Sequence, residues 1–88
     1  MTIIFTNHAK IRQKQRGISS QQINQALKNP DIISEDKAGM PLIGKRINRH
    51  AIIVIFNKIK KGHIIVITVY KVNSSRLTKL KPVIEGRL

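Results

Sequence analysis

Hydrophobic positions change their spacing along the chain, from a short extended run through two helical segments to several strands. Residues 2–6 place β-branched and aromatic residues in a row, which predicts a short strand. Thr6 or Asn7 can cap a helix that runs to about residue 16. Gly17 suits the left-handed position that commonly follows a helix. The chain is therefore expected to open with a strand and a short helix.

The second helix has the clearest start signal in the sequence. Ser19 is a suitable N-cap and Gln22 stands three residues later, which together make a capping box. An apolar stripe at the spacing of one helical face follows, made of Ile23, Ala26 and Leu27. The Asn-Pro pair at residues 29–30 ends the helix, because the residue before a proline avoids the helical region. These signals predict a helix over residues 20–28 that packs against a sheet.

After residue 30 the pattern becomes that of strands. We expect a short strand at Ile32 and Ile33 within residues 31–36, and longer strands at residues 41–48, 51–57 and 63–71. The turns between them are expected at residues 37–40, 49–50 and 58–62. Such short connections favour an antiparallel meander, since parallel crossovers need a dozen residues or more. The sequence thus predicts an α+β domain over residues 1–71, with two helices on a three- or four-stranded antiparallel sheet, and a basic arm over residues 72–88.

The charge balance points to a polyanionic partner. Seventeen Lys and Arg stand against four Asp and Glu, a formal net charge of +13 in 88 residues. Nucleic acid, an acidic protein or an anionic membrane surface would all complement this charge. Membrane insertion is not expected, because no uncharged apolar run approaches the roughly 20 residues that span a bilayer. The absence of cysteine and of a secretory signal pattern fits a cytoplasmic protein.

Candidate chemistry is concentrated on the first helix. His8, Arg12 and Arg16 recur at four-residue intervals and therefore share one side of a helix. A solvent-exposed basic face would explain them equally simply. Such a face normally mixes signs, however, whereas here Lys10 and Lys14 add to the repulsion. A bound polyanion would offset that repulsion.

A second group of candidates lies on the predicted strands. Thr68 and Tyr70 alternate with Ile64 and Val66 on the last strand, so the four are expected on one face. Ordinary strand propensity is the alternative explanation for the two hydroxyl residues. The cations that we expect to follow a nucleic-acid backbone are Lys14, Lys45, Arg46, Lys58, Lys60, Lys61 and Lys71.

The few acids direct the expected mechanism. Asp31, Glu35 and Asp36 fall in one short stretch that reads as a turn beside a strand, and His50 and His63 show no metal-ligand spacing. Two-metal nuclease chemistry needs converging carboxylates, so no metal and no other cofactor is expected. RNA carries its own nucleophile, the 2′-hydroxyl, and can be cleaved by imidazole, guanidinium and phenol groups alone.

Two runs resemble a bacterial family of domains of unknown function. The first is His8-Ala9-x-x-Arg12-x-x-x-Arg16-Gly17-Ile18-Ser19, and the second is Val66-Ile67-Thr68-Val69-Tyr70. That family is similar to RelE/BrnT-like toxins and to small ribonucleases such as barnase and the colicin-type tRNases. The resemblance covers about residues 3–71. It implies N-terminal helices on a curved antiparallel sheet and a ribonuclease in a toxin–antitoxin pair.

We therefore expect a metal-independent endoribonuclease toxin that binds RNA and is masked by an acidic antitoxin. His8 would act as base or acid, Arg12 and Arg16 would hold the phosphate, and Thr68 and Tyr70 would position or protonate. A non-catalytic nucleic-acid-binding module with the same basic surface is the main alternative. A small protein whose basic face docks an acidic protein is a third.

Overall fold

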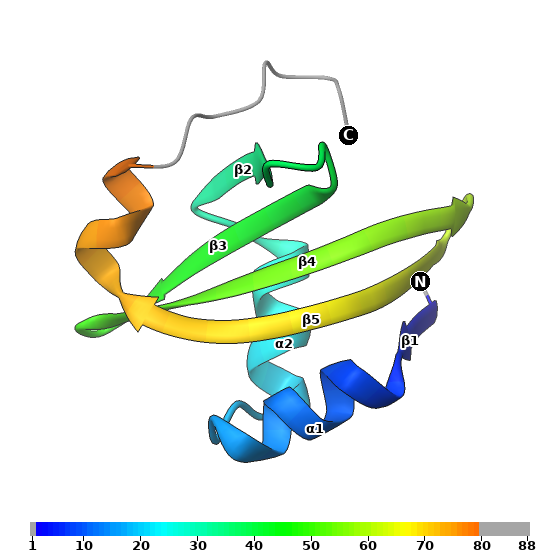
Figure 1. The fold of residues 1–88 in the computed structure, drawn as a ribbon, viewed down its shortest axis with the longest axis horizontal. Coiled ribbons are helices and arrows are strands. Elements are labelled where there is room, and N and C mark those ends of the chain that lie inside the picture. The colour runs from blue at the N-terminus through cyan, green and yellow to red at the C-terminus, as the bar shows by residue number, and fades with distance from the viewer. Residues whose placement is uncertain (1, 80–88) are drawn as a thin grey trace.

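The chain forms an N-terminal strand, then two helices, and then a meander of strands (Figure 1). A computed structural model describes residues 2–79 of the chain. Its elements are β1 (Thr2–Phe5), α1 (Asn7–Gln15), α2 (Ser20–Lys28), β2 (Ile32–Glu35), β3 (Pro41–Ile47), β4 (His50–Lys60), β5 (His63–Asn73) and the 3-10 helix η1 (Ser74–Lys79). The predicted α+β class and both predicted helices are confirmed.

The sheet has five strands in the order β1-β5-β4-β3-β2 and is mixed. Strands β2 to β5 form the expected antiparallel meander. The prediction of a purely antiparallel sheet of three or four strands is wrong, because β1 joins β5 in parallel, from Thr2 opposite His63 to Phe5 opposite Val66. The lengths of the connections in the sequence predict only which consecutive strands pair, so they gave no sign of this pairing. The connection from β1 to its parallel partner β5 runs through both helices and strands β2 to β4.

Both helices begin where their capping residues predict. The Thr6 hydroxyl accepts a hydrogen bond from the Ala9 amide at 3.0 Å. At α2, the Ser19 hydroxyl accepts from the Gln22 amide and the Gln22 side chain accepts from the Ser19 amide, both at 3.1 Å. Gly17 separates the helices with a φ of 64°, which a residue with a Cβ rarely adopts. Local sequence therefore fixes the helix boundaries.

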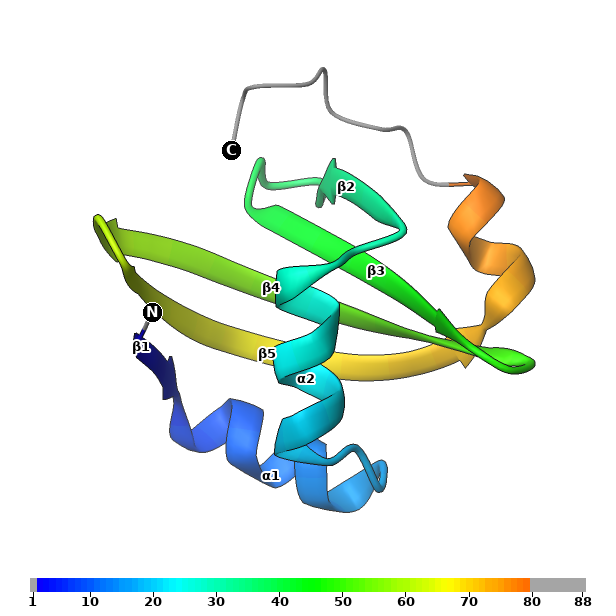
Figure 2. The same cartoon turned by 180° about the vertical axis from the view of Figure 1, so that it is seen from behind.

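Two hydrophobic clusters cover the two faces of the sheet. On the helix face, α2 crosses the strands and packs on β3 and β4, with Ile23 and Ala26 in the cluster (Figure 2). On the opposite face, Leu77 of η1 packs on Leu42, Ala51 and Ile53. Four consecutive residues of β4, Ala51 to Val54, are buried, as expected for a strand covered on both faces.

The strand ends differ from the predicted ones around the two hairpins. The β4–β5 hairpin extends to Lys60, so the turn contains only Lys61 and Gly62 instead of the five residues 58–62. The β3–β4 turn lies at residues 48–49 rather than 49–50. Strand β5 continues to Asn73 and η1 follows, so that residues 72–79 of the expected basic arm lie on the sheet. The remainder of that arm, residues 80–88, lies outside the described residues.

Candidate nucleic-acid interface and active site

Helix α1 lies along the outer edge of β5, beyond the end of β1 (Figures 1 and 2). Ala9 is fully buried and marks the side of α1 that faces the core. Gln13, one turn later, leans toward α2, where its side-chain amide donates to the Ser20 hydroxyl at 2.9 Å. At about 100° per residue, His8 and Arg12 fall on the other flank of Ala9, away from α2.

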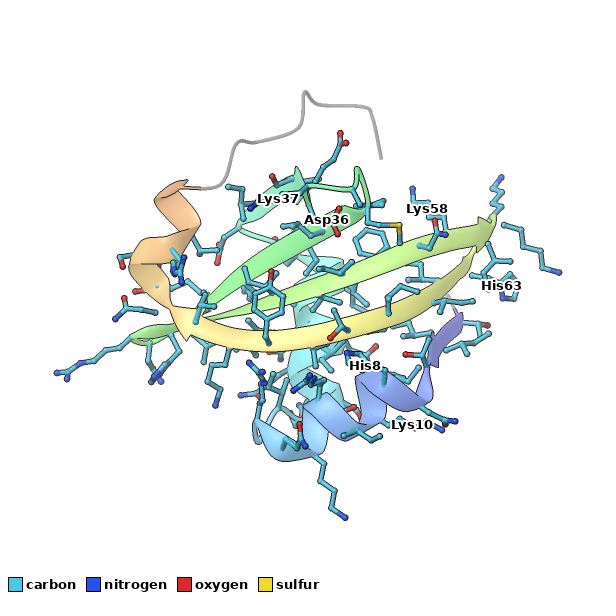
Figure 3. All side chains as sticks on the ribbon, viewed as in Figure 1. His8, Lys10, Asp36, Lys37, Lys58 and His63 are labelled. Carbon is cyan, nitrogen blue, oxygen red and sulfur yellow. The ribbon has the colours of Figure 1, made fainter. Side chains whose placement is uncertain are left out.

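We call His8, Arg12 and Arg16 the α1 ridge. Figure 3 shows His8 on the part of α1 next to β5. Arg12 is half-buried, whereas His8 and Arg16 are exposed, and Arg16 is the C-cap residue. Lys10 and Lys14 lie on the opposite flank of the helix. The structure thus separates Lys14, a predicted backbone contact, from the ridge.

Thr6 holds the start of α1 on β5. Its amide donates to the Val66 carbonyl at 3.2 Å and its hydroxyl donates to the Ile67 carbonyl at 3.0 Å. The same hydroxyl caps α1. Sequence reasoning identified Thr6 only as a cap, because its second partner lies 61 residues away along the chain.

A bulge in β5 reverses which side chains of its second half lie on each face of the sheet. Val66 pairs with Phe56 and Thr68 pairs with Ile55, so Ile67 is an extra residue without a partner on β4. Val66 packs in the helix-face cluster, whereas Tyr70 packs in the opposite one. The prediction that Ile64, Val66, Thr68 and Tyr70 all lie on one face is therefore wrong. Thr68 and Tyr70 do share a face with each other.

Tyr70 is half-buried on the face covered by η1. Burial raises the pKa of its phenol, the negative charge of Asp36 raises it further, and the positive charge of Arg76 lowers it in part. The phenol therefore keeps its proton at neutral pH and can donate a hydrogen bond. Asp36 and Arg76 were not among the predicted site residues. No short-range pattern links them to Tyr70.

Helix α1, which carries the ridge, packs along β5, the strand that carries Thr68 and Tyr70. His8 and Arg12 lie on the flank of α1 away from the Gln13–Ser20 contact with α2, and the two hydroxyl residues lie on the sheet face away from α2. Within residues 2–79, no hydrogen bond joins the two groups, and the Arg12 guanidinium donates only to Gln15, at 3.4 Å. The two groups are neighbours across one strand edge rather than a closed site.

The predicted backbone contacts other than Lys14 lie in three places. Lys58, Lys60 and Lys61 are exposed around a hollow of about 470 Å³ at the tip of the β4–β5 hairpin, which His63 also lines. This end of the hairpin is next to the start of β1, as Figure 3 shows for Lys58 and His63. Lys71 points to the helix face of β5, beside α2. Lys45 forms an ion pair with Asp31 at 3.8 Å, and the same carboxylate accepts from the Arg46 amide at 2.7 Å.

The acidic residues of the described chain gather at the opposite edge of the sheet. Asp31, Glu35 and Asp36 flank or end β2, four strands away from β1. One carboxylate oxygen of Asp36 accepts from the amides of Ala38 and Met40 at 2.9 and 2.8 Å, which closes the turn before β3. Their interpretation as a turn beside a strand is confirmed. The described acids therefore cluster around β2, whereas α1 and the β4–β5 hairpin carry cations and no acid.

Among residues 2–79, none of the helices has the length and apolar character needed to cross a bilayer.

The family described as a domain of unknown function, DUF4258, matches residues 5–71, which is most of the chain. No curated protein and no solved structure matches the chain.

Proposed function

We propose that this chain, which belongs to the DUF4258 family, binds RNA and cleaves it without a metal ion. The observation that carries the proposal is the position of the α1 ridge. An imidazole and two guanidiniums follow the outer edge of β5, next to the face that carries a neutral phenol. These are the groups that RNA cleavage through the 2′-hydroxyl requires.

The binding surface extends from the hairpin tip to α1. In this proposal, Lys58, Lys60 and Lys61 contact phosphates on one side of the ridge, and no acid of the described residues lies between them and α1. Each phosphate neutralised on a single strand contributes about −0.7 to the slope of log K against log salt. Replacing the three lysines by alanine is therefore expected to flatten the slope by about 2. An unchanged slope would remove the hairpin tip from the interface.

The proposed reaction uses the two neighbouring groups in different roles. His8 takes the proton of the 2′-hydroxyl or returns one to the leaving 5′-oxygen, steps that an imidazole performs near neutral pH. Arg12 and Arg16 bind the phosphate and stabilise the added charge of its transition state. Tyr70 donates a hydrogen bond from its neutral phenol rather than acting as a base, and Thr68 positions the phosphate.

The non-catalytic binding module remains a second candidate because of one observation. Nucleophile–base pairs usually include a third group that orients the base. Within residues 2–79, the His8 imidazole has no hydrogen-bond partner that would orient it. In the cleavage proposal the bound phosphate or its sugar supplies that partner. In the module, the same residue only contacts the backbone.

The finer resemblance is part of the same proposal. A RelE- or barnase-like ribonuclease fold is compatible with two helices on one side of a curved antiparallel meander, although β1 adds a parallel strand. We propose that an acidic antitoxin binds the cationic surface in the cytoplasm and blocks RNA. A protein whose only partner is acidic would bind such a polypeptide and not RNA.

The flanks of α1 offer a matched test of the proposal. Cleavage of total RNA in EDTA is measured for the wild-type protein and for the variants His8→Ala, Arg12→Ala and Lys10→Ala. Loss of a positioned acid or base lowers the rate by about 10² to 10⁴. Arg12→Ala is also expected to lower it strongly. Lys10→Ala removes one charge from the opposite flank and should change it little.

Two results would contradict the cleavage proposal. Retained RNA binding with no cleavage by the wild-type protein would favour the binding module. Equal losses for Arg12→Ala and Lys10→Ala would show that only total charge matters, because the two residues differ in flank and not in charge.

A further inference from the structure

A small polar hollow lies between the first turn of α2 and the β3–β4 turn, on the helix face of the sheet. Its volume is about 210 Å³. The residues that line it come from α2, the β3–β4 hairpin and β5: Gln22, Ile47, Asn48, His50, Ile52 and Lys71. It is separate from the α1 ridge, from the Thr68–Tyr70 face and from the hairpin tip.

The floor of the hollow is fixed by the sheet. Ile52 is buried to within 1% and pairs directly with Lys71 of β5. His50 pairs with Ile47 across the β3–β4 turn and with Asn73 of β5. Because directly opposed residues of neighbouring strands share a face, the register sets Lys71 beside Ile52 and His50 beside Ile47. Three strands therefore hold two cationic or ionisable groups around an apolar floor.

The other two polar residues are also held in place. The Gln22 side-chain oxygen accepts from the Ser19 amide at 3.1 Å, which orients the amide group and leaves its NH₂ as the remaining polar end. Asn48 occupies the turn with a φ of 57°, a conformation that asparagine tolerates better than most residues. The Gln22 side chain can donate from a fixed position, and the Asn48 side chain can donate from the turn.

The chemistry of the lining selects an anion. Lys71 supplies an ammonium, Gln22 and Asn48 supply NH₂ donors, and His50 supplies one ring N–H or two. No carboxylate lines the hollow, and Asp31, Glu35 and Asp36 lie around β2. The first turn of α2 contains no acidic residue, so the positive end of its dipole adds to the same potential. Charge-assisted hydrogen bonds of this kind are the strong ones for oxyanions.

The size of the hollow limits the ligand. Pockets for drug-sized ligands measure roughly 300–1,000 Å³. A hollow of about 210 Å³ is too small for a whole nucleotide but accommodates a phosphate group. We propose that this hollow is a phosphate-binding site, separate from the ridge. The inference does not depend on RNA cleavage, since it concerns binding of the oxyanion alone.

Titration of the ¹⁵N-labelled protein with inorganic phosphate tests the proposal, with sodium chloride at equal ionic strength as the reference. The amide resonances of Gln22, Asn48, His50 and Lys71 are expected to shift in a saturable way with phosphate and not with chloride. Equal shifts with chloride, or phosphate shifts confined to α1 and the hairpin tip, would overturn the proposal.

Two charge-matched variants sharpen the test. Lys71→Gln is expected to weaken phosphate binding by about tenfold, since it removes one charge-assisted hydrogen bond. Lys28→Gln removes the same charge from the far end of α2 and should change the affinity less than about twofold. Both lysines are exposed, so both variants should fold, which the unchanged remainder of the spectrum verifies. If both variants weakened phosphate binding equally, the binding would reflect only the general positive charge of the protein, and the proposed site would be refuted.

The source of the phosphate is resolved with two short RNAs of one sequence, one with a 5′-phosphate and one with a 5′-hydroxyl. Preference for the first assigns the hollow to a terminal phosphate, whereas equal Lys71-dependent binding assigns it to an internal phosphodiester. Binding of both RNAs without any dependence on Lys71 would contradict the site. These measurements need no cleavage and therefore fail or succeed independently of the proposed function.

Discussion

The substitution Thr6→Val tests how α1 is held on the sheet. The Thr6 hydroxyl takes part in two hydrogen bonds of 3.0 Å, from the Ala9 amide and to the Ile67 carbonyl. Valine has nearly the same shape and removes both. Loss of an N-cap costs about 1 kcal/mol, and a neutral hydrogen bond contributes about another 1 kcal/mol. We therefore expect the free energy of unfolding to fall by about 2 kcal/mol.

Thermal and urea unfolding measure this effect. For a domain of this size, about 1 kcal/mol corresponds to a midpoint shift of about 4–8 °C, so Thr6→Val should melt about 8–16 °C lower. Thr6→Ser keeps the hydroxyl and should recover most of the stability. Thr2→Val makes the same change at an exposed position of β1 and should stay within about 0.5 kcal/mol of the wild type.

A Thr6→Val protein as stable as Thr2→Val would refute the reasoning. It would mean that packing and the bond from the Thr6 amide to the Val66 carbonyl suffice to hold the start of α1 on β5. Hydrogen exchange of the first α1 amides gives an independent measurement, since the loss of the cap should expose them first.

Three further predictions concern other parts of the fold. Ser19→Ala should lower the free energy of unfolding by about 1 kcal/mol in urea unfolding, because it removes the hydroxyl that accepts from the Gln22 amide, and no loss would contradict the capping role. Gly44→Ala should cost about 1–3 kcal/mol, since a Cβ there would come within 2.5 Å of the Leu77 side chain, and an unchanged midpoint would show that η1 does not pack on β3. The raised pKa of Tyr70 means that the folded state holds the phenolic proton more tightly than the unfolded state. The contribution of this proton to stability is therefore complete below the unfolded pKa of roughly 10 and is lost as the pH rises through the folded pKa. We expect the wild-type protein to lose stability relative to Tyr70→Phe only in that alkaline range. Parallel stability–pH profiles of the two proteins would contradict the assignment.

The local parts of the fold could be predicted from the sequence. The capping bonds of Thr6 and Ser19 and the left-handed backbone of Gly17 involve neighbouring residues only, so they indicate from the sequence where the helices begin and end. The strand meander follows from short apolar runs and short turns for the same reason. These elements needed no information about distant partners.

The features that escaped prediction depend on distant pairings. The parallel partner of β1 is the distant strand β5, and no pattern in residues 2–5 specifies it. The extra residue Ile67 reverses the faces of the second half of β5, which a strict two-residue alternation cannot anticipate. Sequence periodicity therefore grouped Tyr70 with Val66, although the two lie on opposite faces.

The candidate site shows the same division. Spacing of four residues placed His8, Arg12 and Arg16 on one side of α1, because helix geometry alone fixes that relation. Whether that side meets Tyr70 depends on the direction in which α1 leaves β1. The Gln13–Ser20 bond provides that information by fixing which flank faces α2.

The most direct test of metal-independent RNA cleavage uses one oligonucleotide that the protein cuts in EDTA, prepared with either a 2′-hydroxyl or a 2′-O-methyl group at the scissile nucleotide. Our proposal predicts cleavage of the first only, with a 2′,3′-cyclic phosphate or a 3′-phosphate at the new end. Cleavage of the 2′-O-methyl substrate at a similar rate, or a new 3′-hydroxyl end, would contradict it.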